Sequence, residues 1–216
     1  MHETWVMLQK GGILMIPLFL CSIIVLAIVI ERAISLRRKR VLVPGIISII
    51  ETINKSEDIH LAISICSKNE GAFANIVQLG LENKDLPNQE LKELISDQGR
   101  QEVRTLEKGL GVIETVASIA PLLGLLGTVT GMIKVFTVIS EKGLGQTQDL
   151  SGGISEALIT TVAGLSIGIP ALIFYNYFTD KAENLIMDIE KFTSQLIRKL
   201  SRFQSGKTIE NSAQKD

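Results

Sequence analysis

The sequence predicts an all-α integral membrane protein, with three transmembrane helices and long helical cytoplasmic extensions. The 216-residue chain is 46% hydrophobic but only 5% aromatic, and its mean hydropathy is +0.31, which is unusual for a soluble domain. Its apolar residues gather in three long runs, each close to the roughly 20 residues that a helix needs to cross a bilayer. The polar segments show helical periodicity and no alternating strand pattern.

The first apolar run indicates how the chain is oriented. No charge interrupts the sequence from Gly12 to Ile30, and four basic residues follow at Arg37–Arg40. Cytoplasmic flanks carry the excess of Lys and Arg, whereas a signal peptide has its positive charges before the apolar core. We therefore expect residues 1–11 to form an external N-terminal segment and residues 12–36 to form the first transmembrane helix.

The second and third runs predict transmembrane helices at residues 112–139 and 154–178. The segment between them, residues 140–153, holds few charges and is expected to be an external loop. Basic residues recur after the third run, which again marks the cytoplasmic side. The sequence thus predicts three spans, with the N-terminus outside and the C-terminus in the cytoplasm.

The polar segments predict a helical cytoplasmic region at residues 37–111 and an amphipathic cytoplasmic helix at residues 179–204. From Gln89 an apolar stripe leads into the second span without a strong breaker, which predicts one continuous helix of about 50 residues. The apolar stripe after the third span needs a partner, and the preceding cytoplasmic helices are the nearest candidates. The polar tail, residues 205–216, is expected to be disordered.

Composition and motifs exclude several classes of function. The net charge of −1 comes from 22 basic and 23 acidic side chains and gives no basic stripe for nucleic acid. Cys21 and Cys66 are poorly placed to pair across a membrane boundary and are predicted to be reduced. His2 and His60 have no companion at ligand spacing, and the sequence carries no catalytic motif. We therefore expect no enzyme activity, no cofactor and no metal.

Two of the predicted spans carry faces of small residues at helical spacing. These faces contain Gly124, Gly127 and Gly131 on the second span, and Gly164 and Gly168 on the third. Because small residues let helix backbones approach closely, we interpret the glycines as helix-packing positions. Pro121 and Pro170 each remove a backbone donor and are expected to kink their helices.

Polar side chains within the spans are the candidates for function, because such groups must be buried in protein or face water. Thr128 and Thr161 lie roughly 10–17 Å from the outer ends of their helices and can line one polar pathway, although membrane threonines commonly bond their own helix's carbonyls. Glu156 is either an interfacial carboxylate, stabilised by the helix dipole, or the mouth of a proton or cation path. Lys134 either extends outward to water or pairs with Glu156.

Three stretches within the predicted spans carry a family resemblance. They are IAPLLGLLGTVTGMIKVF (Ile119–Phe136), ISEALITTVAGLSIGIPALIFYNYF (Ile154–Phe178) and LQKGGILMIPLFL (Leu8–Leu20). The sequence resembles the MotA/TolQ/ExbB proton-channel family, and within it the ExbB-type members most. The likeness covers all three spans in order, whereas the cytoplasmic region agrees only in placement and helical character.

The resemblance implies a channel subunit of an energy-transducing complex in the inner membrane of a Gram-negative bacterium. Such subunits form a homopentamer in the lipid bilayer, whose lumen holds an ExbD-like single-span partner with an essential membrane aspartate. Proton flow then drives a TonB-like protein that powers outer-membrane transport. By the same resemblance, Thr128 and Thr161 match the family's pore-lining threonines, and Glu156 matches its functionally important acidic residue. Thr160, next to Thr161, leaves the identity of the lumen-facing hydroxyl open.

Alternative functions stay open at this point. One is a TolQ-like or gliding-type motor subunit of the same family, and another is a non-conducting membrane scaffold in which the small residues serve packing alone. Three spans argue against a MotA-type stator, which has four. The residues themselves suit protons and sodium alike, and only the resemblance favours protons.

Overall fold

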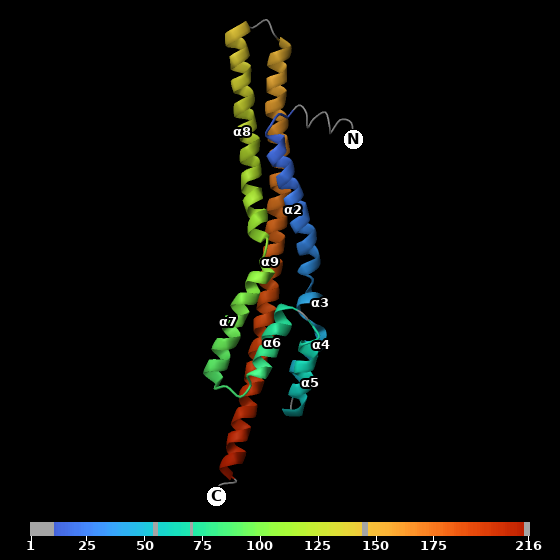
Figure 1. The fold of residues 1–216 in the computed structure, drawn as a ribbon, viewed down its shortest axis with the longest axis vertical. Helices are drawn as coiled ribbons and strands as arrows, with labels where there is room; N and C mark the ends of the chain where they lie inside the picture. Colours follow the sequence, from blue (N-terminus) through green and yellow to red (C-terminus); the bar gives the residue numbers. More distant parts are fainter. Residues whose placement is uncertain (1–10, 54–55, 70, 144–146, 214–216) are drawn as a thin grey trace. The chain divides into compact units, whose positions relative to one another are not determined.

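The computed structural model describes residues 11–53, 56–69, 71–143 and 147–213, and all its regular elements are helices (Figure 1). No strand occurs within these ranges, so the predicted all-α fold class is confirmed. The helices are α2 (Met15–Ser35), α3 (Arg38–Val41), α4 (Pro44–Thr52), α5 (Ser56–Cys66), α6 (Ala72–Glu82), α7 (Asn88–Leu106), α8 (Leu110–Lys142) and α9 (Thr147–Ala213).

The chain divides into two compact units. We call residues 1–32 and 109–178 the span unit, and residues 33–108 and 179–216 the polar unit. The long helix α9 contributes its first part to the span unit and its second part to the polar unit. Each unit is therefore built from segments that are distant in the sequence.

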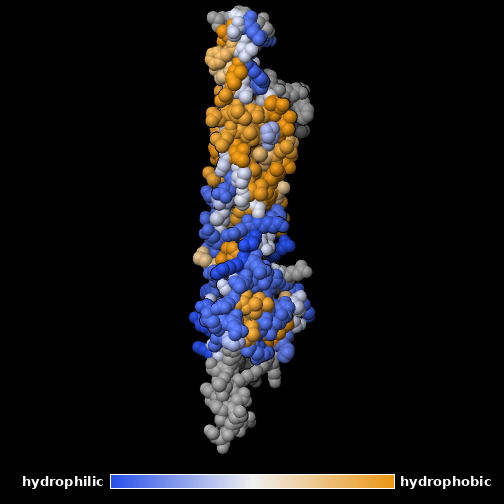
Figure 2. Space-filling view, turned by 60° about the vertical axis from the view of Figure 1, so that its left-hand side comes forward, coloured by the Kyte–Doolittle hydropathy of each residue, from blue (hydrophilic) through white to orange (hydrophobic). Residues whose placement is uncertain are grey.

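Three helices, α2, α8 and α9, are long and apolar enough to cross a membrane. Large apolar side chains on them stay exposed, among them Leu122, Ile133 and Val162, and Figure 2 shows a largely hydrophobic surface over the span unit. Such helices bury too little of their apolar surface within the chain to be stable in water. The three predicted spans are thus confirmed as long apolar helices.

A glycine separates α7 from α8, so the expected continuous helix from Gln89 into the second span is wrong. Helix α7 ends at Leu106, and Gly109 takes a left-handed conformation with φ of +80° just before α8. Only glycine adopts this conformation without steric cost. The backbone of Gly109 also lies close to Ile28 of α2, because a Cβ atom there would be 3.1 Å from the Ile28 Cγ2 atom.

Helices α8 and α9 are longer than the spans predicted from the sequence. Helix α8 continues to Lys142 and α9 begins at Thr147, so both extend into the segment 140–153 that we expect to be a loop. At its other end α9 continues to Ala213, within the segment 205–216 that we expect to be disordered. Extending an existing helix by one residue costs far less than starting a new one, which favours such continuation.

The polar unit is held together by the apolar stripes that the sequence predicts. Ile46 and Ile50 of α4, together with Ile95 of α7, are buried. On α9 the stripe Leu185, Ile189, Leu196 and Leu200 is also buried. Its partners are the preceding helices, since the ring of Phe192 lies 5.9 Å from that of Phe73 on α6, and a Cβ on Gly80 would contact Leu196 at 3.3 Å.

Polar contacts also connect α9 to the start of the polar unit. The ammonium group of Lys199 donates to the backbone oxygens of Glu51, at 2.5 Å, and Ile53, at 3.4 Å. These carbonyls belong to the C-terminal end of α4, where backbone acceptors lack helical donors and a cation is favourable. Arg38 forms a second connection, an ion pair of 2.9 Å with Asp188.

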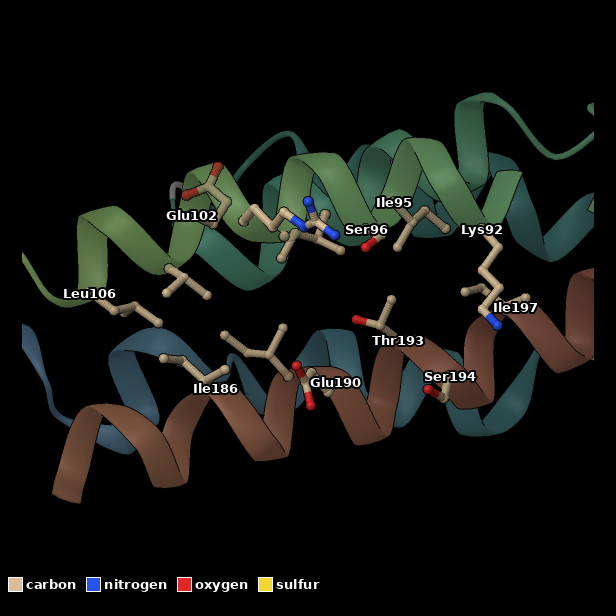
Figure 3. Close-up of a pocket in the computed structure, with 15 residues that line it drawn as sticks. Lys92, Ile95, Ser96, Glu102, Leu106, Ile186, Glu190, Thr193, Ser194 and Ile197 are labelled. Carbon is tan, nitrogen blue, oxygen red and sulfur yellow. The ribbon is translucent and has the colours of Figure 1, made fainter. Parts of the chain in front are cut away.

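A cavity of about 490 Å³ lies between α7 and α9 in the polar unit (Figure 3). Apolar side chains such as Ile95, Leu106 and Ile189 form much of its wall. Thr193 on α9 is only 8% exposed, and its hydroxyl has no hydrogen-bond partner among the described residues. A buried hydroxyl without a partner is unfavourable for folding, and polar side chains such as Ser96 and Glu190 also line the cavity.

Candidate ion-pathway site in the span unit

The candidate site is built on a close antiparallel contact between α8 and α9. A Cβ added to Gly164 would lie 2.5 Å from the Ala120 carbonyl oxygen, and one on Gly131 would lie 2.9 Å from that of Gly153. A Cβ added to Gly124 would lie 3.0 Å from the Thr160 carbonyl oxygen. The obstructing atoms are backbone atoms, which cannot rotate away. The glycines therefore allow the two backbones to approach within van der Waals contact.

The same contact continues at Pro121, where the helix lacks a backbone donor. Proline at this position leaves the Ala117 carbonyl without its helical hydrogen bond. Gly168 of α9 packs here, because a Cβ on it would lie 2.6 Å from the proline ring and 3.2 Å from the Ala117 oxygen. The unpaired Ala117 carbonyl is thus covered by α9 rather than exposed to lipid.

Pro170 has different surroundings. It lies inside α9 and leaves the carbonyl of Ser166 without its helical donor. Both residues are exposed, and they line a shallow groove of about 410 Å³ together with Val162, Leu165 and Ile169. This freed carbonyl therefore lies on the outer surface of α9.

Two of the three candidate threonines bond their own helix. The Thr128 hydroxyl donates to the Leu125 carbonyl at 2.6 Å, and the Thr160 hydroxyl lies within hydrogen-bond distance of the Glu156 carbonyl, at 3.0 Å, and the Ala157 carbonyl, at 2.9 Å. Thr160 is only 1% exposed and contacts the Gly127 position of α8. Its side chain is therefore enclosed between the two helices.

The third threonine, Thr161, connects the helices instead. Its hydroxyl donates to the Gly124 carbonyl of α8 at 3.1 Å. Thr161 is thus level with Gly124, one helical turn or about 6 Å from Thr128. Thr128 and Thr161 are both half-buried within this chain, so part of each side chain stays accessible on the surface of the span unit.

Glu156 forms an ion pair with Lys134, which is one of the two possibilities that the sequence leaves open. The Lys134 Nζ atom lies 2.6 Å from the Glu156 Oε1 atom. The side chain of Glu156 is 20% exposed and that of Lys134 is 58% exposed. The carboxylate also packs against Gly12, where a Cβ would collide with Oε1 and where φ is +70°. Glu156 is therefore held between α8 and the segment that leads into α2.

A comparison with known families shows what kind of protein carries this arrangement. The model of the MotA/TolQ/ExbB proton channel family matches residues 68–191. The chain belongs to this family. The match contains all of α8, the span part of α9 and every candidate site residue from Pro121 to Pro170. Membership in this family and three apolar helices make the chain a multi-pass protein of the inner membrane.

Individual members of the MotA/TolQ/ExbB family give the same assignment. The biopolymer transport protein ExbB of Aquifex aeolicus is 42% identical over 87 residues, which is 40% of this chain and 59% of that protein. The ExbB-like protein 3 of Synechocystis sp. is 30% identical over 217 residues, covering 90% of this chain and 94% of that protein.

The Tol-Pal system protein TolQ of Haemophilus influenzae is 35% identical over 107 residues, covering 50% of this chain and 47% of that protein. The chain thus spans about half to three fifths of the length of two of these three relatives.

One residue of the candidate site, Gly12, could not be recognised from the sequence motifs. Gly12 begins the first apolar run, a position that by itself indicates no role, yet its backbone packs against Glu156. The signal was the pair Gly11–Gly12 at the beginning of the first span, since adjacent glycines often mark a close backbone approach.

Proposed function

We propose that the chain is an ExbB-like proton-channel subunit of an inner-membrane motor. With an ExbD-like partner it uses the proton motive force to energise TonB-dependent transport across the outer membrane of a Gram-negative bacterium. The observation that carries this proposal is the family match over residues 68–191, which includes both helices of the candidate site. The N-terminus is periplasmic and the C-terminus cytoplasmic in this proposal, as the basic flanks favour.

The surfaces of α8 and α9 support assembly with further copies of the chain. Their small-residue faces pack against each other within the chain, whereas large apolar residues such as Leu125, Phe136 and Leu158 stay exposed. A homopentamer would cover part of this surface with neighbouring copies and part with lipid. The lumen of that pentamer would hold the transmembrane helix of the partner.

Within this assembly we assign the proton pathway to Thr128, Thr161 and Glu156. The hydroxyls of Thr128 and Thr161 donate to carbonyls, so their oxygen lone pairs stay free to accept a hydrogen bond from a water or a protonated carboxyl group. Thr160 is enclosed between α8 and α9, and we assign it to packing. A partner aspartate could stay protonated in the apolar zone and ionise where it meets water.

A TolQ-like role is the second candidate, because the Haemophilus influenzae TolQ protein is 35% identical to the chain over 107 residues. The two roles differ in the partner proteins that the motor drives. Affinity purification of the chain from its own cells separates them, since an ExbB-like subunit retains a TonB-like protein and a TolQ-like subunit retains a Tol-type partner.

Proton flux through the purified complex tests the channel itself. We expect flux in proteoliposomes to depend on the membrane aspartate of the single-span partner and to fall at least tenfold in the double variant T128V/T161V. The variant T115V is the matched control, because Thr115 is an exposed threonine of α8 that also bonds its own helix, at 2.7 Å. Flux that persists without the aspartate would reject the proposed pathway, whereas a wild-type complex that shows no flux would favour the non-conducting scaffold.

A further inference from the structure

The carboxylate of Glu156 lies beside a groove that offers several oxygen atoms. The groove is shallow, has a volume of about 540 Å³ and runs along the loop ends of α8 and α9. Thr137, Gln148, Asp149 and Glu156 are among the residues that line it. Carboxylate, amide and hydroxyl oxygens are the ligands that hard metal cations prefer. By its chemistry this groove could therefore hold a sodium ion.

Lys134 already places a cation in this groove. Its Nζ atom lies 2.6 Å from Oε1 of Glu156, and Lys134 itself is one of the lining residues. A sodium ion bound to the same carboxylate would lie within about 4 Å of the ammonium group, where two like charges near a protein surface repel each other by several times the thermal energy. Unlike Lys134, the ion would also have to give up part of its hydration shell.

The packing around Glu156 keeps the carboxylate in this position. Gly12 leaves no room on the side of α2, since even a Cβ atom there would collide with Oε1. On the same turn of α9, Ala157 is buried against the Gly131 position of α8. The carboxylate therefore cannot easily turn away from Lys134 to meet an ion elsewhere in the groove.

We propose that Lys134 is a specificity-determining residue that excludes sodium from the Glu156 carboxylate. The ammonium group takes the position that a sodium ion would need, whereas a proton needs no shell of ligands and can move along water and hydroxyl groups beside the pair. This inference deepens the proposed function and rests on it only for the statement that protons are the transported ion.

Sodium-dependent thermal stability tests the inference without measuring transport. The chain is purified in nanodiscs, and its unfolding midpoint Tm is compared in NaCl and in choline chloride of equal ionic strength. We expect the wild-type Tm to be the same in both salts. In K134M the carboxylate is free to bind sodium, and a weakly bound ion in excess should raise Tm by about 2 °C.

Three further variants give the control. K134R keeps the cation and should behave like the wild type, K134Q should gain the sodium effect as K134M does, and K134M/E156Q should lose it because the carboxylate is gone. K134Q also replaces K134M if the latter does not fold, since glutamine can still hydrogen-bond Glu156. A wild-type Tm that rises in sodium, or Lys134 variants without a sodium effect, would overturn the inference.

Proton flux through the wild-type complex separates this inference from the proposed function. Absence of flux there counts against the channel, whatever the sodium data show. Flux in the wild type, with no sodium effect in K134M or K134Q, leaves the channel intact and rejects the role of Lys134.

Discussion

Replacing Gly164 by alanine tests the close contact between α8 and α9. The added Cβ would lie 2.5 Å from the Ala120 carbonyl oxygen and 3.0 Å from the Gly124 Cα atom. Ordinary contact requires about 3.4 Å, so the helices must separate by roughly 0.9 Å, the difference between 3.4 and 2.5 Å. Neither obstructing atom belongs to a flexible side chain, and the strain cannot relax locally.

The cost of this separation follows from what it disrupts. Inserting a methyl group into a well-packed interface costs about 1–3 kcal/mol. The Thr161–Gly124 hydrogen bond, now 3.1 Å, would stretch beyond bonding distance, and such bonds between membrane helices contribute about 0.6 kcal/mol on average. Alanine regains up to about 1 kcal/mol of helix propensity over glycine. We therefore expect a net loss of about 1–3 kcal/mol, of the order of the packing term.

The assay is the thermal unfolding of the purified chain in nanodiscs, with G152A as the matched control. Gly152 lies on the same helix, and a Cβ on it would meet nothing within 4 Å. G152A should be as stable as the wild type or slightly more stable, whereas the Tm of G164A should fall by several degrees. If both variants unfold at the same temperature, the helices do not pack as closely as described.

Three further predictions concern the polar unit. Burial, aided by the negative charge of Glu82, raises the pKa of the Cys66 thiol to about 11. Maleimide at pH 8 should therefore label Cys66 at least tenfold faster in urea than in the folded protein. Equal labelling rates in the two states would contradict the burial of Cys66. T193V should stabilise the chain by about 1 kcal/mol in urea titrations, because it removes a buried hydroxyl that has no partner among the described residues. A loss of stability would show that this hydroxyl is bonded. K199M should cost about 0.3–1 kcal/mol in the same titration, since it removes the donor to the Glu51 carbonyl; an unchanged midpoint would refute a capping role.

Much of the fold follows from the sequence because it depends on local composition. The three spans are apolar runs of sufficient length, and the buried stripe with Leu196 and Leu200 follows from spacings of three and four residues. The apolar stripe hides the helix break at Gly109 because it continues through this position, although a glycine after a basic residue is a common signal for a helix end. Apolar periodicity therefore predicts that this region is helical, whereas the conformation of Gly109 decides where one helix ends and the next begins.

The candidate site could be predicted only in part, because its contacts depend on the register between helices. Glycine spacing marks the faces that meet, but not that Thr161 rather than Thr160 bonds Gly124 across the contact. The Lys134–Glu156 pair requires the two residues to be level on neighbouring helices, which one sequence leaves undetermined. Gly12 becomes part of the site only because the segment before α2 lies against Glu156 of α9.

The carbonyl of Gly124 has two donors, and this has a spectroscopic consequence. Within α8 it accepts the backbone N–H of Thr128, as helix geometry requires, and it also accepts the Thr161 hydroxyl. A carbonyl that accepts two hydrogen bonds absorbs at a lower amide I frequency than neighbouring carbonyls that accept one. An isotope label at Gly124 would therefore give an infrared band that reports directly on the register of α8 against α9, and any sliding of the two helices during the working cycle would move that band.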